Sequence, residues 1–589
     1  MFDRNFVLKN FSGGWVTETL PDLIQPNESS SAAQSPELIN VDFKSGSIKK
    51  APGYSELGTD TDTTIKTNLI PSSYRSGSSL LFAKSGTTLK VLDETKKVWL
   101  TIMTGLTDSD RPSYQYFDSL LYLFNITGSA IKIDLSKTAR LASDALLGAT
   151  TITLVNSTAL PASGTIYLNS TAVTYTGNTA NQLTGCSGTP VSSAGDFVIT
   201  APVTVSGIKK GNITAYFAGR FFVAVGSNIY GSKLNSLEDF TVLTSGVGDA
   251  ILSTLESEIK AMRVFPDQDG TPKLFIFTAY GARYSCDVDD NTTLSGTFFT
   301  KKIVPGGVTP ISNEVMVSGT NDIFYVDSYN MIRSLGQSYK DRGITKVMSD
   351  VISLDHETLF KNNYNFAYTR GCFKDNELHL LATDGNGTYN NRCLIYDVYS
   401  QNWRKREDIL ANDIVVYKNQ FVFCNAYDNK VMIIDGSLNN NQSPIRMVYE
   451  TLDINTSHLC FEKLRRVRMM VKMSKNCQFN VKAYGNYKST LLGDWNVVGS
   501  DEDIKISSIS NSSLGGSFVW GEEVFGQDGD NEIGFFIMDL EMDANETENY
   551  RFVIENNQDG VYLEIFKIKP IFEVMPENYF PDQYIKKSN

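Results

Sequence analysis

The sequence predicts an all-β protein built around a β-propeller, and three observations lead to this prediction. Phe (33) and Tyr (28) are abundant in a chain of 589 residues, and aromatic residues favour strands over helices. Short strand-like runs alternate with turns rich in Gly, Asn and Asp. A hairpin followed by a returning strand recurs at spacings of about 35–55 residues, which is the period of propeller blades.

The repeated unit is a pair of apolar strands joined by a polar turn and followed by a third strand. A single unit cannot bury both of its faces, so the units must pack against one another. The alternative is an ordinary antiparallel sandwich. Clear copies are Tyr116–Asp134, Tyr216–Tyr230, Asp322–Arg333, Cys372–Asp397 and Val416–Asp435, and weaker copies begin near Leu80 and Lys273.

Two departures from the repeat divide the chain into domains. The spacing between the copies at Tyr116 and Tyr216 exceeds one blade by roughly sixty residues, and nearly uncharged strands fill the excess. Surface loops tolerate such insertions, and the longer strands after Pro444 predict a separate sandwich-like domain. We expect an N-terminal arm with the first strands at 1–75, a propeller at 76–140 and 203–440, an inserted β domain at 141–202 and a C-terminal β domain at 441–589.

Charge and cysteine usage exclude several classes of function. The formal net charge is −13, which argues against wrapping nucleic acid because phosphate neutralisation needs a surplus of Lys and Arg. Seven scattered Cys without a CxxC pair predict buried thiols instead of a zinc or disulfide framework. We expect no membrane span and no secretory leader, because no long apolar run occurs. Synthesis and folding in a cytoplasm are therefore expected.

A distinctive order of short phrases marks the N-terminal region and two later points. The phrases are Gly13-Gly14, Leu20-Pro21, Pro36–Phe43, Gly46–Tyr54, Asn228–Phe240 and Leu335–Asp350. They resemble the tail nozzle (tail tubular B-type) and related tail-hub or DNA-stabilisation proteins of short-tailed bacteriophages. Within Asn228–Phe240, Leu237 stands where the family usually has Pro.

The resemblance implies a structural virion protein of the phage tail, made in the host cytoplasm. It implies a propeller with an added β domain that assembles as a ring, usually a hexamer, on the tail axis. The implied partners are further copies of the chain, an adaptor or portal-side ring, tail fibres or spikes, and genomic DNA passing through the lumen. A net-acidic wall suits this role, because it repels the duplex and lets it slide. The N-terminal arm is a candidate for contact with a neighbouring ring or subunit.

A basic run on a predicted strand is the candidate contact site. Strict alternation places Lys463 and Arg465 on one face, and Arg466, Arg468 and Lys472 on the other. The run could lie near DNA or pair with acidic residues of this chain or of a neighbouring subunit. The acidic net charge favours pairing.

Two alternatives of other classes are a glycan- or receptor-binding propeller, which would use Tyr-, Asn- and Asp-rich blade loops, and a sialidase-like hydrolase. Thr383–Tyr389 resembles the Asp-box of sialidases, but Ala382, Asn386 and Tyr389 replace its Ser, Gly and Trp, and the box occurs once. A blade turn explains it better. A hydrolase would also need a positioned pair of carboxylates.

The remaining motifs do not predict catalysis. His356 begins a zincin-like phrase, but Phe360 replaces its second ligand. His379 is expected to be a buried strand residue, and His458 to lie in a polar turn. Asp528–Glu532 lacks the full calcium-binding loop. We therefore expect no catalytic residue, no metal and no cofactor.

Overall fold

The computed structural model confirms the all-β fold. Strands form nearly all of the regular structure, and Asn313–Val315 forms a short 3-10 helix (η1). The structure describes residues 8, 14–15, 34–43, 46–73, 79–107, 111–124, 129–242, 248–266, 270–289, 299–304, 308–320, 322–335, 346–347, 364–385, 387–451, 453–455, 462–485, 488–499, 504–508, 516–519, 526–528, 531–541 and 549–574.

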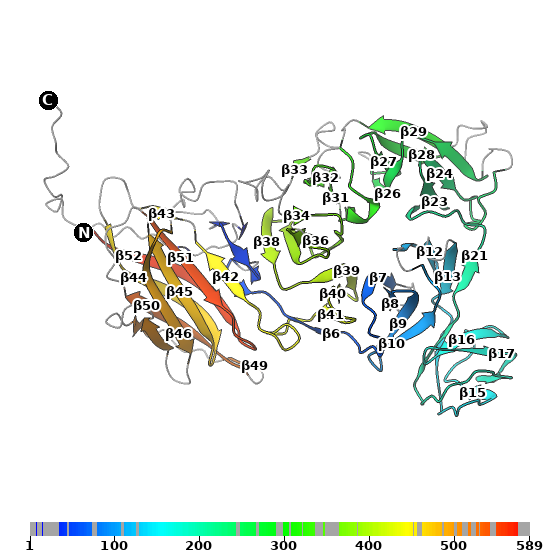
Figure 1. The fold of residues 1–589 in the computed structure, drawn as a ribbon, viewed down its shortest axis with the longest axis horizontal. Coiled ribbons are helices and arrows are strands. Elements are labelled where there is room, and N and C mark those ends of the chain that lie inside the picture. Colours follow the sequence, from blue (N-terminus) through cyan, green and yellow to red (C-terminus); the bar gives the residue numbers. More distant parts are fainter. Residues whose placement is uncertain are drawn as a thin grey trace.

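Seven antiparallel blades surround a common axis (Figure 1). In blades 1 to 5 the first strand along the chain lies innermost. Blade 1 consists of β7 (Lys66–Ser73), β8 (Ser79–Ser85), β9 (Thr88–Asp93) and β10 (Val98–Met103), and blade 2 of β11 (Ser113–Phe117), β12 (Leu120–Phe124), β13 (Ala130–Asp134) and β21 (Val203–Val205). Blade 3 consists of β22 (Ile213–Phe217), β23 (Arg220–Val225), β24 (Asn228–Gly231) and β25 (Ile251–Thr254), and blade 4 of β26 (Ile259–Pro266), β27 (Pro272–Thr278), β28 (Arg283–Val288) and β29 (Phe299–Val304).

Blades 5 to 7 follow the same plan. Blade 6 carries an extra inner strand, β34, that pairs with the far end of β36. Blade 5 consists of β30 (Val317–Ser318), β31 (Ile323–Val326), β32 (Ile332–Ser334) and β33 (Lys346–Val347). Blade 6 consists of β34 (Tyr364–Asn365), β35 (Gly371–Lys374), β36 (Glu377–Asp384), β37 (Arg392–Asp397) and β38 (Asn402–Arg406). Blade 7 consists of β39 (Ala411–Tyr417), β40 (Gln420–Asn425), β41 (Val431–Ile434) and β6 (Tyr54–Glu56).

Apolar side chains fill each interface between neighbouring blades. Phe82 of blade 1 and Leu121 of blade 2 belong to one such cluster, and Leu69 and Val422 belong to the cluster between blades 1 and 7. Equivalent clusters join the other neighbours around the ring. Because every blade buries both of its faces against its neighbours, the repeats depend on the closed ring for their stability.

The ring closes through the N-terminal segment. Strand β6 is the outermost strand of blade 7 and pairs antiparallel with β41, with Ser55 opposite Ile433. The chain then crosses to the inner strand of blade 1. We expected residues 1–75 to hold an N-terminal arm with the first strands and the propeller to begin at residue 76. The structure places 54–56 in the last blade and 66–73 in the first. This pairing spans the whole propeller sequence, so no local pattern predicts it.

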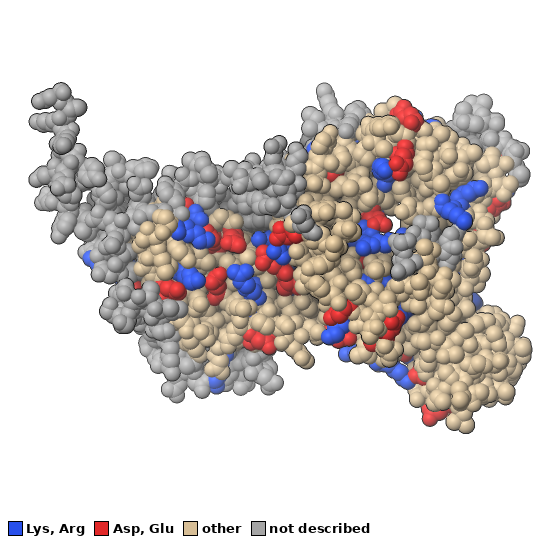
Figure 2. All heavy atoms as spheres, in the orientation of Figure 1, with Lys and Arg blue, Asp and Glu red and all other residues tan. Residues whose placement is uncertain are grey.

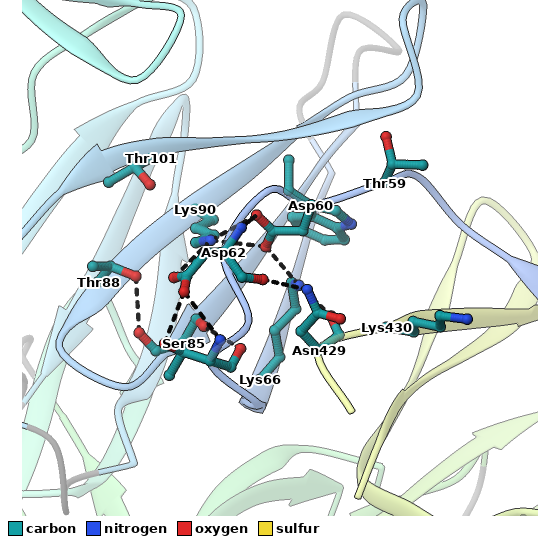
Figure 3. A network of polar contacts seen from close by, with 12 residues as sticks. Thr59, Asp60, Asp62, Lys66, Ser85, Thr88, Lys90, Thr101, Asn429 and Lys430 are labelled. Atoms are coloured by element: carbon teal, nitrogen blue, oxygen red, sulfur yellow. Dashed lines mark hydrogen bonds and ion pairs between the residues drawn. The ribbon is translucent and has the colours of Figure 1, made fainter. Parts of the chain in front are cut away.

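A network of buried charges fastens this crossover (Figure 3). Asp60 accepts from Lys66 and Lys90 of blade 1 at 2.7 and 2.8 Å. Lys66 also donates to the main-chain oxygen of Asn429 in blade 7, and the Asn429 amide donates to the main-chain oxygen of Asp62. Buried ions of this kind are tolerated only when paired, and here the pairing joins the first and last blades.

An inserted domain interrupts blade 2 between β13 and β21. Its apolar core includes Ile166 and Val198. It rests on blade 1, where Arg140 pairs with Asp93 at 2.8 Å and Lys96 pairs with Asp196. The strands are β14 (Thr138–Arg140), β15 (Thr151–Thr153), β16 (Gly164–Leu168), β17 (Thr171–Tyr175), β18 (Gly177–Thr179), β19 (Gln182–Thr184) and β20 (Phe197–Thr200).

The C-terminal region forms a two-layered β domain beside the propeller (Figure 1). Two sheets enclose a core that includes Val467, Trp495 and Phe552. The strands of one sheet are β4 (Val41–Asp42), β5 (Ile48–Lys50), β52 (Leu563–Val574), β44 (Glu462–Ser474), β50 (Asn531–Glu541), β48 (Gly516–Val519) and β49 (Gly526–Asp528). Those of the other are β3 (Leu38–Ile39), β42 (Met447–Glu450), β51 (Asn549–Asn556), β45 (Gln478–Gly485), β46 (Thr490–Gly499), β47 (Ile504–Ser508) and β43 (Ile454–Asn455).

The propeller and the C-terminal domain share one sheet. Strand β3 pairs with β42 of the domain on one side and with β38 of blade 6 on the other. Residues 38–50 of the expected arm are therefore built into this chain's own sheets. Two further N-terminal strands, β1 (Gly14–Trp15) and β2 (Gln34–Ser35), pair in parallel. Within the described residues no helix is long and apolar enough to cross a membrane.

Candidate functional site

The inner strands of all seven blades surround a cavity of about 390 Å³ on the propeller axis. Each blade, or the loop that leads into it, supplies side chains to the wall. Charged and polar groups predominate among them. One from each of blades 1 to 7 in turn is Asn68, Tyr114, Thr214, Arg263, Glu314, Arg370 and Asp413.

Arg263 is a fixed part of the wall. Its two terminal nitrogens donate to the Asn313 side chain at 2.7 Å, to the Asn313 main-chain oxygen at 2.8 Å and to the Met262 main-chain oxygen at 2.9 Å. Burial lowers the pKa of Arg263 to about 10. The guanidinium therefore keeps its charge at neutral pH, with its donors largely engaged.

Arg370 enters the cavity from the loop before β35. It forms an ion pair with Glu314 and donates to the Thr369 main-chain oxygen at 2.9 Å. Burial, followed by the charge of Arg111, lowers the pKa of Arg370 to about 9. Arg111 therefore stands close enough to Arg370 for the two cations to repel one another.

Asp413 holds the inner strands of blades 7 and 1 together. One carboxylate oxygen accepts from the Asn68 amide and from the Leu69 main-chain nitrogen, each at 2.8 Å, and the other accepts from the Ile414 main-chain nitrogen at 2.9 Å. Burial raises the pKa of Asp413, although Arg370 and Arg111 act in the opposite direction. Both oxygens of this carboxylate are therefore engaged in hydrogen bonds to blades 1 and 7.

Arg111 differs from the other charged groups of the cavity. It lies just before β11, its side chain is half-buried, and its Nη1 atom is buried without a hydrogen-bond partner. Among the described residues it forms no ion pair. The cavity therefore holds three guanidinium groups against two carboxylates, inside a chain whose net charge is −13.

Sequence reasoning did not single out these arginines, although a signal exists. Arg111 stands two residues before β11, and Arg370 stands one residue before β35. Aligning the repeats in register would have placed both at the same end of the axis. Arg263 lies within its strand and shares no such position.

The predicted basic run lies on β44, away from the axial cavity. Arg468 contacts the buried carboxylate of Asp539 with two nitrogens at 2.7 and 2.8 Å, and Arg466 lies 3.4 Å from the same group. Lys472 lies over the ring of Tyr562 at 5.6 Å. Two members of the run thus pair within the chain, while a role toward DNA or another subunit stays a prediction.

A β-bulge changes the predicted faces of this run. The register of β44 against β52 shifts between Leu464 and Arg466. Strict alternation would turn Arg465 inward with Val467, but the bulge leaves Arg465 exposed and keeps Leu464 buried. The side chain of Lys463 lies outside the described part of the chain.

The other candidates from the sequence, where the structure describes them, are a buried strand residue and a turn residue that forms an ion pair. His379 is buried in β36, with Nε2 3.3 Å from a Glu377 oxygen, and burial lowers its pKa to about 4. In the loosely Asp-box-like turn, Asp384 pairs with Arg392 at 2.9 Å. His356, His458 and the side chains of Asp528–Glu532 lie outside the described residues. Among the described residues, no cluster of three or more potential metal ligands occurs.

Charge on the visible face is mixed. Figure 2 shows Lys and Arg interleaved with Asp and Glu where the propeller meets the C-terminal domain, and an almost uncharged inserted domain. This matches the sequence from 141 to 200, whose only charged residues are Asp144 and Asp196. Neither region of this face carries a large patch of one sign.

Comparison with known proteins adds little beyond the fold. No protein-family model matches the chain, and no curated protein does. Among solved structures, Chaetomium thermophilum Raptor is similar over 65% of this chain and 29% of its own, with 10% identity and a TM-score of 0.33. The β-propeller domain of Myceliophteria thermophila Cps50 (Swd1) is similar over 63% of this chain and 98% of its own, with 9% identity and a TM-score of 0.26.

Proposed function

We propose that the chain is a structural protein of a short phage tail. In this proposal several copies form a ring, a nozzle or hub, that conducts and retains DNA and docks other tail parts. The resemblance of the N-terminal phrases supplies the biological context. The observation that supports a mechanical role is the fusion of propeller and C-terminal domain through one continuous sheet.

The phrase Pro36–Phe43 forms this joint. Asn40 adopts a left-handed backbone (φ 52°), and its side chain accepts from the Glu407 main-chain nitrogen at 2.9 Å in the propeller. It also donates to the Arg446 main-chain oxygen at 2.7 Å, next to the C-terminal domain. Asp42 pairs with Arg404 of blade 6 at 2.8 Å.

Buried apolar groups reinforce the joint. A single core contains Leu380 of blade 6, Val41 of the joint and Met469 of the C-terminal domain. Interfaces that are large and hydrophobic suppress relative domain motion. A protomer of this kind transmits force between its two ends as one body, which suits a tail component.

In this proposal the DNA passes between protomers. The axial cavity has a volume of about 390 Å³, which is the size of a small-molecule pocket. Side chains from all seven blades project into it. A duplex does not fit there, so the conduit must be the central opening of the assembled ring.

Native mass spectrometry and negative-stain imaging of the purified full chain test the proposal. We expect a closed ring of several copies with an axial hole. A chain that stays monomeric at micromolar concentration, alone and with extracts of assembled tails, would contradict it. Deleting residues 1–33 tests the arm, because this deletion keeps every strand from β2 onward. It also removes the buried Leu8, which pairs with Ile568, so thermal unfolding of the variant must first show that the C-terminal domain is still folded. Deleting 1–45 would also remove β3 and β4 and would confuse folding with assembly.

A second candidate function is glycan or receptor binding, and the position of exposed tyrosines favours it. In an antiparallel blade, the turn between the second and third strands and the loop entering the first strand lie on the same face. Tyr280, Tyr329 and Tyr427 occupy such turns in blades 4, 5 and 7, and Tyr368 lies in the loop entering blade 6. Tyr280 is 88% exposed.

A glycan array distinguishes the two functions. Binding by the wild-type chain that is lost in Tyr280→Ala and Tyr329→Ala, but kept in Tyr399→Ala, would favour recognition by this face. Tyr399 is a matched control because it is equally exposed, at 91%, and lies in a turn on the opposite face. An array without signal would leave the mechanical role as the better account.

A further inference from the structure

We propose that the axial cavity is a binding site for a small oxyanion, with Arg111 and Arg370 holding the carboxylate or phosphate group of a soluble ligand. This site is independent of the proposed tail function. It rests on three observations: an unpaired arginine, an excess of cationic groups around one cavity, and a volume suited to a small molecule.

The buried, unpartnered donor of Arg111 is the first reason to expect an anion in the cavity. A buried donor without a partner destabilises the fold, and a charged donor does so more strongly. The Nη1 atom of Arg111 is buried and unpartnered, and the guanidinium forms no ion pair within the described chain. An anion in the cavity would supply the missing acceptor and remove this cost.

The neighbouring groups carry the second step. Arg370 already uses one donor on Thr369 and pairs with Glu314. It lines the same cavity as Arg111, and the two like charges oppose one another. An oxyanion between them would turn this repulsion into two favourable contacts. Arginine is suited to this task because its planar fork matches carboxylate and phosphate oxygens.

The remaining acids do not neutralise this pair. Asp413 directs both oxygens to amide donors, namely Asn68, Leu69 and Ile414. Glu314 is engaged by Arg370. Burial raises the pKa of Asp413, which opposes its ionisation. Among the described residues, therefore, neither acid of the cavity forms an ion pair with Arg111.

Space and access carry the third step. The cavity of about 390 Å³ lies within the usual range of small-ligand sites, about 300–1,000 Å³. Arg111 and Arg370 both precede the first strand of their blade, so both lie at the same end of the axis as the exposed tyrosines. A ligand entering from this face would meet the two arginines first.

The test uses the full chain and three probes, which are inorganic phosphate, glucuronate and neutral glucose. Calorimetric titration and thermal unfolding are run at constant ionic strength against sodium chloride. We expect phosphate or glucuronate to bind and to raise the unfolding temperature, whereas glucose does neither. The better of the two anions identifies whether the site prefers a phosphate or an acidic sugar.

The informative variant is Arg111→Gln, because Arg370→Gln would also break the pair with Glu314. We expect Arg111→Gln to weaken anion binding about 10-fold or more, the usual effect of losing a charged hydrogen bond. Its unfolding temperature without ligand should equal or exceed that of wild type, which shows that the fold is intact. Arg446→Gln is the control, because Arg446 is exposed and lies in the segment between the propeller and β42.

Three results would overturn the proposal. The first is a wild-type chain on which both anions act no differently from chloride. The second is an Arg111→Gln chain that binds the anions as tightly as wild type. The third is equal binding of glucose and glucuronate, because the charge of the ligand would then not be recognised.

Discussion

The carboxylate of Asp413 accepts a hydrogen bond of 2.8 Å from the main-chain nitrogen of Leu69. Asp413 lies on the inner strand of blade 7, and Leu69 lies on the inner strand of blade 1. The two residues are 344 positions apart in the chain. This bond therefore joins the ends of the propeller sequence at its axis, while β6 joins them at the rim.

Replacing Asp413 by Ala should loosen the ring from the inside. The substitution leaves the buried Leu69 nitrogen and the Asn68 amide without an acceptor, and we expect a loss of about 1–3 kcal/mol in the free energy of unfolding. Asp413→Asn is the matched control, because it keeps one acceptor oxygen and should lose less. Urea unfolding followed by tryptophan fluorescence measures both. Equal losses in the two variants would contradict this role.

Ring closure at the rim should depend on Gly53. Its main-chain nitrogen donates to the Ser437 oxygen at 2.7 Å, and an added Cβ would overlap the carbonyl oxygen of Asn439. Gly53→Ala must therefore push β6 away from β41, and we expect a loss of roughly 1–3 kcal/mol, as for other overpacked sites. Limited proteolysis should cleave near β6 earlier than in wild type.

The control for Gly53 is Ser55→Ala on the same strand. Ser55 donates to Asp435 at 2.5 Å in an exposed position, where a hydrogen bond contributes about 0.5–1.5 kcal/mol at most. Proteolysis of Ser55→Ala should resemble that of wild type. If Gly53→Ala also resembles wild type, the close approach at Asn439 is not needed for closure.

The joint between propeller and C-terminal domain should depend on Asn40. Asn40→Ala removes both side-chain hydrogen bonds to Glu407 and Arg446, and it places a residue with a Cβ but no amide at φ 52°. We expect a loss of about 2–3 kcal/mol from the bonds and the strained backbone together.

Asn40→Gly separates these two causes, because glycine adopts the left-handed region freely. It should recover the backbone part but not the hydrogen bonds. Calorimetric scans should show whether the two domains then unfold in separate transitions. A single transition in both variants, at the wild-type temperature, would show that the shared core alone fixes the joint.

The basic run contains Arg468, which pairs with a buried carboxylate, and Arg465, which lies at the surface. Arg468→Ala leaves the fully buried carboxylate of Asp539 with only the more distant Arg466, and we expect a loss of roughly 2 kcal/mol in stability. Arg465 is exposed, so Arg465→Ala should cost less stability than Arg468→Ala. If the run touches DNA, Arg465→Ala should weaken duplex binding and reduce its salt dependence. Unchanged binding would exclude Arg465 from such a contact.

The sequence pattern predicted those parts of the fold that form through contacts between residues close together in the chain. Hairpins such as β12–β13 and β40–β41 bury alternating apolar residues against neighbouring blades, so the repeat is visible in the sequence. The inserted domain is equally visible, because uncharged strands interrupt the repeat. In blade 5 the hairpin within Asp322–Arg333 was visible as a clear copy, whereas its outermost strand, the two residues Lys346–Val347 of β33, is too short to show a pattern.

Contacts between distant parts of the chain escaped sequence reasoning. Ser55 and Asp435 are 380 positions apart, and no periodicity records their pairing. The axial cavity has the same origin, because ring closure brings together Arg111, Arg263 and Arg370 from three different blades. The exposure of Arg465 depends on a bulge, which strict alternation cannot anticipate. Of the N-terminal phrases, Pro36–Phe43 lies where the propeller joins the C-terminal domain, and Gly46–Tyr54 leads into the last blade.

Acid should destabilise the propeller partly through His379. Burial lowers the pKa of this imidazole from 6.5 to about 4 in the folded chain. Between pH 6.5 and 4 the unfolded chain therefore binds a proton that the folded chain does not, so stability falls as the pH falls through this range. Below about pH 4 both states are protonated and this contribution stops changing.

The surroundings explain why the neutral ring is preferred. His379 packs on the ring of Phe421 at 3.9 Å and contacts Cys393, and the charges of Arg404 and Arg406 also oppose its protonation, while Glu377 favours it. Replacing His379 by Gln removes the titrating group and keeps a polar side chain. The pH profile of the urea midpoint between 7 and 4 should then be flatter than that of wild type. The full difference corresponds to roughly 3 kcal/mol. Parallel profiles for wild type and His379→Gln would show that other groups carry the acid sensitivity.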